Sequence, residues 1–590
     1  MRIALLTEGG YPYPGGDSVV WCDRLVRGLG GHEFEVYALG RGERQRAGAW
    51  PALPDNVRRV RTAPLWGPAP GDGPRGGSGG YGRRERRRFG EHFADLAGAV
   101  CAEPGEEAAT AEADRFASGL HGLADLARER GGLAAALRSE QALRLLEAAC
   151  RAPGALRAVR AAAVTDLLTV TGELERVLRP LSLDWYGEPG LATADVCHAV
   201  GGGPAALPGL LAGRLFGTPL LVTEYGVRLR EHYLASAAHA VAPHAVSAPV
   251  RALLASFHRR LAGEAYRRAD LITSGNTHAR RWQQRCGADR NRLRTVHPGM
   301  DASPLTGIEE DTGEERPDPL LVWTGRIEPA RDLVCLLHAF AGVRRTVPGA
   351  RLLIAEHPGG PAAADGREAE AYLAHCRALA AQLFPDEAAD ALSVGDNPVR
   401  FARIGDPEVP RLADAYAAAD VAVLSSVVEG LPIPLVEAMF AGRATVSTDV
   451  GAVREVIGGT GLVVPPRNPR ALADACVALL GDPARRARLG AAARARALEL
   501  FTVEQNVAAF RGIYLELLSR RPEPARGTAG ARPFARPPEA HLPVHRAVLT
   551  DRAGGRAGRG PSWARTAPEP RAAPGTVPAG APTGAREGRR

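Results

Sequence analysis

Short apolar runs alternate with amphipathic stretches along most of the chain, beginning at its first residues. An apolar run at residues 3–7 leads into a glycine-rich loop, helical spacing follows over residues 19–29, and residues 34–39 alternate as a strand does. A strand, a helix and a second strand in this order predict a parallel sheet. The chain therefore opens as a βαβ unit.

The pattern then changes character for about a hundred residues. Residues 68–82 hold seven glycines in fifteen positions and are expected to form a flexible loop. Residues 83–179 are rich in Ala, Leu, Arg and Glu with helical periodicity and few strand signals. We therefore predict a helical insertion at about residues 83–180.

Strands and helices alternate again after the insertion. The predicted strands of the first series are residues 195–200, 220–223, 271–273 and 293–296, and those of the second series are residues 320–324, 352–355, 421–424, 444–448 and 462–464. A helix with one apolar face is predicted at residues 503–518.

These series predict two doubly wound, Rossmann-like α/β domains. We expect the first domain at residues 1–302, a linker at 303–319, the second domain at 320–500 and a closing helix at 501–519. Residues 520–590 are rich in Arg, Pro, Gly and Ala, and such a composition cannot bury a core, so we expect a disordered tail.

The charge of the chain is concentrated in that tail. The net charge is +8, yet residues 520–590 hold 14 arginines against 5 acidic residues, a net of +9, which leaves −1 for the other residues. All 74 basic residues are arginine, so a functional lysine is available here only as arginine. The tail has almost no aromatic residues, only Phe534 and Trp563, and no folded module, so nucleic acid is not an expected partner.

The eight cysteines are scattered without a CxxC pair, and the start of the chain lacks the long apolar segment of a signal peptide. These features favour a cytoplasmic protein, with any membrane contact peripheral, at the inner face. No Asp-x-Asp motif is present, and we expect neither a metal nor a cofactor.

Two glutamates flank the turn that follows the strand at residues 421–424. Glu429 lies in the loop at the carboxyl end of this strand, where open α/β sheets bind ligands. Pro434 suits the first turn of the next helix, Gly442 suits its end, and Glu437 lies about one turn into it. The pair can accept hydrogen bonds from sugar hydroxyls, and the helix N-terminus favours a diphosphate.

These residues resemble the donor site of family 4 glycosyltransferases, which have the two-domain GT-B fold. The resemblance rests on Glu429-x7-Glu437 with the residues up to Gly442, on Asp449-Val-Gly-Ala-Val-Arg-Glu455, on Gly461-Leu-Val-Val-Pro-Pro, and on Gly325-Arg326 followed five residues later by Arg331. The family usually has lysine at that last position, and arginine can also clamp a diphosphate.

The first domain resembles the PelF-type branch of this family, which carries an N-terminal DUF3492-type domain and contributes to exopolysaccharide synthesis. The matching segments are Leu6-Thr7-Glu8-Gly9-Gly10-Tyr11-Pro12-Tyr13, Asp195-Val-Cys-His198 and Thr223-Glu224-Tyr225-Gly226 with Arg230-Glu231. The resemblance covers residues 2–519 and leaves only the tail outside.

The resemblance implies a role for each matching residue. Glu429 and the backbone of Gly430, Leu431 and Pro432 hold donor-sugar hydroxyls, and Glu437 holds the ribose hydroxyls. Arg326 and Arg331 bind the diphosphate and stabilise its charge as it leaves. Gly16 lets backbone N–H groups approach the phosphate from the first domain. His198 is a candidate catalytic group, with a backbone-satisfied strand-end histidine as the alternative, and Glu224, Tyr225 and Arg230 are acceptor-side candidates.

Tyr225 departs from the family pattern, which has histidine at this position. A tyrosine donates a hydrogen bond but carries no charge at neutral pH. The function implied is retaining transfer of a hexose from a nucleotide diphosphate sugar, UDP-glucose or similar, to a polysaccharide or other glycan acceptor. The alternatives are a small-acceptor glycosyltransferase and a non-catalytic nucleotide-sugar-binding component of a polysaccharide assembly. The expected partners are a nucleotide sugar, a glycan acceptor and, through peripheral association, a membrane polysaccharide-synthesis complex.

Overall fold

The computed structural model describes residues 1–13, 17–40, 52–67, 81–103, 105, 109–226, 247–357, 366–385 and 397–520. The chain divides into a compact unit, Met1–Arg521, and the stretch Pro522–Arg590. The predicted tail and most of the predicted glycine-rich loop lie outside the described residues.

Within the described residues, seven parallel strands form the N-terminal sheet in the order β3-β2-β1-β4-β5-β6-β7. The strands are β1 (Arg2–Glu8), β2 (Glu33–Gly40), β3 (Val57–Pro64), β4 (Val196–Val200), β5 (Leu220–Glu224), β6 (Leu271–Ser274) and β7 (Leu293–Thr295). The central strands are almost wholly buried because helices cover both faces, as a parallel sheet requires. Six of these strands were predicted from the sequence, with ends that differ by one residue at most, and β3 was missed.

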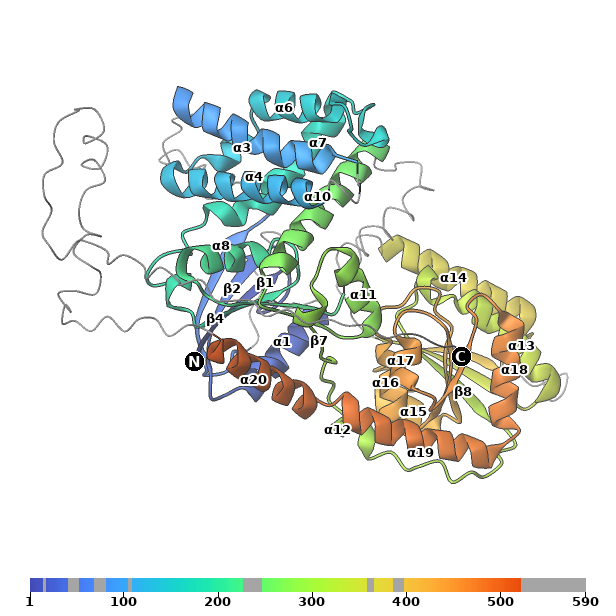
Figure 1. The fold of residues 1–590 in the computed structure, drawn as a ribbon. Helices are drawn as coiled ribbons and strands as arrows, with labels where there is room; N and C mark the ends of the chain where they lie inside the picture. The colour runs from blue at the N-terminus through green and yellow to red at the C-terminus, as the bar shows by residue number, and fades with distance from the viewer. Residues whose placement is uncertain are drawn as a thin grey trace, which may run out of the picture. The chain divides into compact units, whose positions relative to one another are not determined.

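A cluster of helices between β3 and β4 confirms the predicted insertion (Figure 1). Its apolar faces and one face of the sheet share a single core, in which Phe93, Leu96, Phe116 and Leu123 are fully buried. The helices are α3 (Arg83–Cys101), α4 (Ala109–Arg130), α5 (Leu133–Leu137), α6 (Glu140–Arg151) and α7 (Val164–Leu178), with the 3₁₀ turns η1 (Arg157–Val159), η2 (Arg179–Ser182) and η3 (Leu191–Thr193).

The remaining elements of this half connect the strands. They are α1 (Asp17–Gly28), α8 (Ala206–Phe216), α10 (Ala248–Arg268), α11 (Thr277–Arg285) and η4 (Arg290–Arg292). The predicted linker contains a short helix, α12 (Ser303–Thr306). Among the described residues, no helix is long and apolar enough to cross a membrane.

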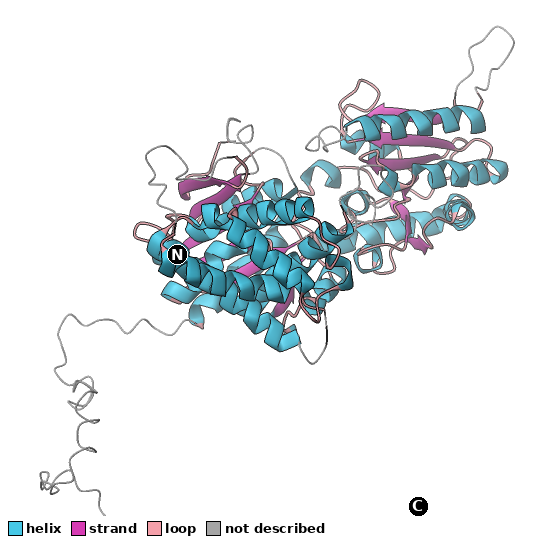
Figure 2. Ribbon diagram, turned by 90° about the horizontal axis from the view of Figure 1, so that it is seen from above, coloured by secondary structure: helices cyan, strands magenta, loops and turns pink. Residues whose placement is uncertain are grey.

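The C-terminal sheet has six parallel strands in its described part, in the order β10-β9-β8-β11-β12-β13. They are β8 (Leu320–Gly325), β9 (Arg351–Glu356), β10 (Val399–Arg403), β11 (Val421–Leu424), β12 (Ala444–Thr448) and β13 (Leu462–Val464). Five of these strands confirm the sequence prediction, and β10 was missed. Figure 2 shows helices on both sides of these strands. The two doubly wound domains predicted from the sequence are therefore present.

The helices of this half are α13 (Leu333–Thr346), α14 (Gly366–Leu383), α15 (Leu412–Ala418), α16 (Ile433–Phe440), α17 (Val453–Ile457), α18 (Pro469–Leu480) and α19 (Pro483–Leu500), with the 3₁₀ turn η5 (Pro329–Arg331). The last helix, α20 (Val503–Ser519), returns to the N-terminal sheet and lies beside α1 (Figure 1). Phe510, Tyr514 and Leu517 of α20 share a core with Ile3 and Leu5 of β1. The C-terminal segment thus completes the core of the first domain.

Candidate functional site

Glu429 lies in the loop that joins β11 to α16, at the carboxyl edge of the C-terminal sheet. The strand is buried on both faces, and the two polar residues that follow it, Ser425 and Ser426, are fully buried as well. Pro434 stands in the first turn of α16, and Gly442 follows the helix with a φ of 68°. The helix boundaries predicted from these two residues are confirmed.

Arg331 of η5 meets Glu429 from the neighbouring loop after β8. Its guanidinium donates to a carboxylate oxygen of Glu429, to Oε1 of Glu328 at 3.0 Å and to Oγ of Ser426 at 3.5 Å. The backbones of the two loops are also joined, since Ser425 Oγ donates to the Arg331 carbonyl at 2.7 Å. The structure thus brings together two residues that are 98 positions apart and were both predicted as site residues.

The Glu429 carboxylate is 6% exposed, and Arg331 is 15% exposed. Burial raises the pKa of Glu429, and the positive charge of Arg331 opposes that rise. A carboxylate and a guanidinium held at a strand edge can bind a ligand that offers hydroxyl groups to one and negative oxygens to the other.

Of the three predicted backbone positions Gly430, Leu431 and Pro432, the first is held by the loop after β12. The Ala452 N–H donates to the Gly430 carbonyl at 3.1 Å. Gly451 has a φ of 56°, and a side chain there would clash with the main-chain carbonyl of Glu429 and approach that of Gly430 to 2.8 Å. A glycine at position 451 is what permits the close approach of the two loops.

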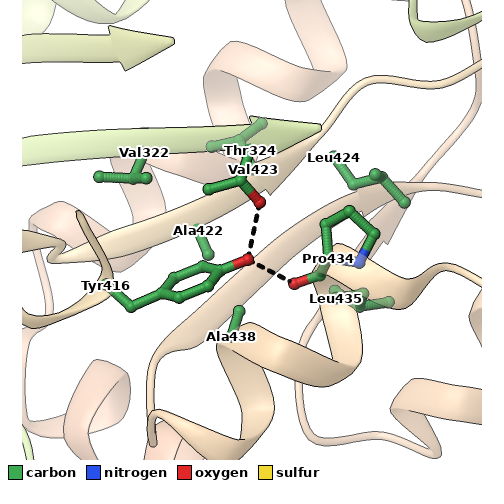
Figure 3. A pocket seen from close by; sticks show the side chains of 9 residues that line it. All are labelled: Val322, Thr324, Tyr416, Ala422, Val423, Leu424, Pro434, Leu435 and Ala438. Atoms are coloured by element: carbon green, nitrogen blue, oxygen red, sulfur yellow. Dashed lines mark hydrogen bonds between the residues drawn. The ribbon is translucent and has the colours of Figure 1, made fainter. Parts of the chain in front are cut away.

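Glu437 lies on α16 and meets two residues that the sequence analysis did not single out. Tyr416 Oη lies 3.3 Å from Oε2 of Glu437, 2.9 Å from the Pro434 carbonyl and 2.7 Å from Thr324 Oγ1. Figure 3 shows this tyrosine lying across the small, mainly apolar cavity beneath α16, with its hydroxyl directed at Thr324 and Pro434. Burial, followed by the charge of Glu437, raises the pKa of Tyr416 well above its usual value.

His357 is the second residue that was missed. Its Nε2 atom lies 3.6 Å from Oε2 of Glu437, and the residue follows β9 directly at the same carboxyl edge. Its position just after a predicted strand was the feature of the sequence from which His357 could have been predicted as a site residue. Tyr416 carried no such signal, because it lies within a helix and reaches the site through the core.

Arg326 follows β8 and its side chain is exposed. Within the described part of the chain, no hydrogen bond or ion pair of this guanidinium is found. Arg326 therefore presents a positive charge at the edge that also carries Arg331.

His198 does not join this site. It is fully buried on β4, where Nδ1 lies 2.6 Å from the hydroxyl of Tyr514 on α20 and Nε2 lies 2.7 Å from Thr223 Oγ1. Burial lowers the pKa of His198 to about 3, so the ring is neutral at physiological pH. The expectation that His198 acts as a catalytic group is corrected: both ring nitrogens are satisfied inside the core, although by side chains and not by the backbone.

Glu224 is also a buried structural residue. Its carboxylate accepts from the Gly202 N–H at 2.7 Å, from Gln283 Nε2 at 3.2 Å and from the Tyr266 hydroxyl, and the residue is 3% exposed. A carboxylate with these internal donors holds the edge of the N-terminal sheet together, so the acceptor-side expectation is corrected for Glu224.

Tyr225 is half-buried at the end of the strand that carries Glu224. Its ring lies edge-on to Trp21 at 5.1 Å, and its hydroxyl accepts from Asn506 Nδ2 at 3.1 Å. Burial raises the pKa of Tyr225, which keeps the phenol neutral. Gly16 and Arg230, the other two predicted site residues, lie outside the described residues.

Comparisons with known proteins divide the chain at the same place as the fold. Residues 1–291 match the family described as a domain of unknown function, DUF3492, and residues 318–482 match the family described as glycosyl transferases group 1. The second match contains Arg326, Arg331, Glu429 and Glu437.

Curated relatives resemble part of the chain. A D-inositol 3-phosphate glycosyltransferase of Xylanimonas cellulosilytica is 30% identical over 267 residues, which is 43% of this chain and 58% of the relative. The protein of the same name from Kineococcus radiotolerans is 33% identical over 232 residues, 36% of this chain and 49% of the relative. The chain thus spans about half the length of these relatives.

Among solved structures, sucrose-phosphate synthase from Thermosynechococcus elongatus is similar over 88% of this chain and 100% of its own, with 16% identity and a TM-score of 0.51. At that identity the likeness concerns the fold, and the fold is the two-domain GT-B arrangement predicted from the sequence. Within the described residues, no group of three or more His, Cys, Asp or Glu residues is placed to hold a metal ion.

Proposed function

The chain joins a DUF3492 domain to a group 1 glycosyl transferase domain, and on that premise we propose that it is a retaining glycosyltransferase. It would move a hexose from a nucleotide diphosphate sugar, UDP-glucose or a similar donor, to a polysaccharide or other glycan, in exopolysaccharide synthesis. The observation that carries the proposal is the buried Arg331–Glu429 pair at the carboxyl edge of the C-terminal sheet, followed by Glu437 about one turn into α16.

The proposed roles follow from the chemistry of these groups. Arg326 and Arg331 would bind the donor diphosphate, and Arg331 would then share its donors between the phosphate and Glu429. Glu429 and the backbone of Gly430, Leu431 and Pro432 would hold the hydroxyls of the hexose. Glu437, oriented by Tyr416, would accept hydrogen bonds from the ribose hydroxyls.

In the proposed reaction, the bond between the anomeric carbon and the diphosphate oxygen breaks while the acceptor oxygen bonds to that carbon from the same face. The acceptor proton passes to the departing phosphate oxygen. This step requires stabilisation of the negative charge on the leaving group, which the guanidinium groups of Arg326 and Arg331 would supply. It needs no protein base, which agrees with a buried, neutral His198.

The test measures the release of UDP when the purified chain is incubated with UDP-hexoses and an oligosaccharide acceptor. Glu429→Ala is expected to lower the rate about a hundredfold or more, because it removes the sugar-binding carboxylate. Glu408→Ala, at an exposed glutamate in the loop before α15, is the matched control and should keep the wild-type rate. Equal rates for the two variants would refute the assignment.

Two alternative functions remain, and each is supported by a separate observation. The relatives named D-inositol 3-phosphate glycosyltransferase support a small acceptor, which the same assay detects when inositol 3-phosphate replaces the oligosaccharide. Tyr225, where the family has histidine, supports a binding component without turnover. That function gains support if UDP-hexoses raise the melting temperature without being consumed and Tyr225→His restores turnover.

A further inference from the structure

Two cysteines of the helical insertion lie next to each other inside its core. Cys101 is the last residue of α3, and Cys150 lies in the last turn of α6, 49 positions further along the chain. Their Sγ atoms are 3.7 Å apart. All eight cysteines lie in the described part of the chain as free thiols, so these two are in contact but not bonded.

The backbone holds the ends of the two helices together. The Leu156 N–H donates to the Cys101 carbonyl at 2.8 Å, and Ala102 and Ala155 form an antiparallel bridge. Helices α3 and α6 also pack against each other (Figure 1). A disulfide bond is about 2 Å long, so the two sulfur atoms need to approach by less than that length to form one.

The surroundings give the two thiols different reactivities. The hydrogen bond from Cys101 lowers the pKa of Cys150, burial opposes this decrease, and the charge of Arg151 adds to it. The hydrogen bond to Cys150 and burial both raise the pKa of Cys101. Because the thiolate is the form that reacts with oxidants, Cys150 is expected to react first.

Cys150 also lies close to exposed parts of the chain. The residue itself is 2% exposed, but Arg151, Pro153 and Gly154 beside it are exposed. The last turn of a helix opens locally at a low free-energy cost, because its carbonyl groups lack partners within the helix. A small oxidant such as hydrogen peroxide reaches Cys150 during such an opening, and a bulky reagent does not.

We propose that Cys101 and Cys150 are a redox-sensitive pair that a hydroperoxide converts reversibly into a disulfide. The thiolate of Cys150 attacks a peroxide oxygen and the O–O bond breaks, which leaves a sulfenic acid on Cys150 and a hydroxide that takes up the proton released by the Cys150 thiol. The sulfur of Cys101 then attacks the sulfur of Cys150, and the S–O bond breaks.

The departing oxygen takes the proton of the Cys101 thiol and leaves as water. The two sulfur atoms together lose two electrons, and the peroxide is reduced to two molecules of water. A dithiol reductant reverses the oxidation by thiol–disulfide exchange.

The bond would close a loop of the helical insertion that contains α4 and α5. Closing a loop restricts the unfolded chain and so stabilises the folded state, by more for a longer loop. We therefore expect the oxidised chain to melt several degrees above the reduced chain. Neither cysteine belongs to the candidate donor site, so this property does not depend on the proposed transfer activity.

The experiment treats the purified chain with hydrogen peroxide, blocks the remaining thiols after denaturation and maps the tryptic peptides by mass spectrometry. Because trypsin cleaves after arginine, Cys101 lies in the peptide 89–115 and Cys150 in the peptide 145–151. We expect these two peptides to be joined, at a mass lower than their sum by two hydrogen atoms. Dithiothreitol should separate them again.

Two variants test the assignment of the sulfur atoms. Cys150→Ala removes the sulfur that reacts first, so peptide 89–115 should stay unlinked and peroxide should not raise the melting temperature. Cys476→Ala is the matched control, because Cys476 is 1% exposed in the core of the C-terminal domain. This variant should form the link, and gain the same increase in melting temperature, as the wild type does.

Three results would overturn the proposal: the two peptides stay separate after peroxide treatment, they are joined only to peptides that carry other cysteines, or peroxide raises the melting temperature of Cys150→Ala as much as that of the wild type. The peptide map of the wild type decides the first two, so a variant that fails to fold does not remove the test. UDP release by the reduced chain is measured separately. A chain that forms the link but releases no UDP would support this proposal while the proposed function fails.

Discussion

Arg331→Met tests whether the Arg331–Glu429 pair is the electrostatic centre of the donor loop. Methionine keeps much of the apolar stem of arginine and removes the guanidinium. Glu429, at 6% exposure, then loses the positive charge that opposes the effect of burial, and Glu328 remains beside it. The variant leaves a buried carboxylate whose remaining hydrogen bonds, from Ser426 and the backbone of Gly430, supply no positive charge.

The magnitude follows from the burial of the two partners. Removing one partner of a buried ion pair costs about 3–5 kcal/mol. Arg331 is 15% exposed and not fully buried, so we expect the lower end, about 3 kcal/mol, near pH 8. The loss should shrink near pH 5, because a carboxyl with a raised pKa is protonated more readily in the folded protein than in the unfolded chain.

The sign of the pH effect follows from proton binding. Between the ordinary pKa of a glutamate and the raised pKa of Glu429, the folded protein binds more protons than the unfolded chain does. Stability therefore falls as pH rises through this window. Removing Arg331 extends the window upward, so the variant loses more stability than the wild type when pH is raised from about 5 to about 8.

The assay is urea denaturation of wild type, Arg331→Met, Glu429→Gln and the double variant at both pH values. Glu429→Gln removes the charge that needs compensation, so the double variant should recover most of the stability that Arg331→Met loses at the higher pH. An unchanged denaturation midpoint for Arg331→Met, or a double variant as unstable as the single one at the higher pH, would refute the reasoning.

Two further variants test the surroundings of the site. Burial lowers the pKa of His198 to about 3, so the unfolded chain binds a proton that the folded protein excludes, and stability should rise with pH from about 3 to about 6.5. His198→Gln is expected to flatten this rise in urea denaturation, and an unchanged slope would contradict a buried neutral imidazole. Gly451→Ala should lower both the melting temperature and the affinity for UDP. The left-handed backbone conformation costs an alanine about 1–2 kcal/mol of stability, and the clash with the Glu429 carbonyl adds to this cost. Gly459→Ala is the control, because Gly459 also has a positive φ, 94°, but no atom lies within 4 Å of the Cβ that alanine would add. The reasoning fails if this variant loses as much stability as Gly451→Ala or changes the affinity for UDP.

The sequence by itself determined the two-domain architecture and the edge of the C-terminal sheet at which the candidate site lies. Strands buried on both faces are recognisable as apolar runs, and all eleven strands predicted from the sequence are present in the structure. The missed strands β3 and β10 both lie at sheet edges, where charged residues alternate with apolar ones, as in Val57–Pro64 and Val399–Arg403. Glu429 and Glu437 were singled out because ligands bind at the carboxyl ends of parallel strands, and Arg331 was singled out by its resemblance to a family motif.

Tertiary structure alone decided which side chains of the N-terminal domain lie inside. His198 and Glu224 stand at or near strand ends, as ligand-binding residues do. Their positions in the sequence therefore could not show whether the side chains lie in the core or at a ligand site. Residues that alternate along a strand face opposite sides of the sheet, and what covers each side depends on distant segments. Tyr514 of α20 reaches His198 from 316 positions away, and Gln283 reaches Glu224 from 59. Packing between elements far apart in the chain therefore assigned these two residues to the core.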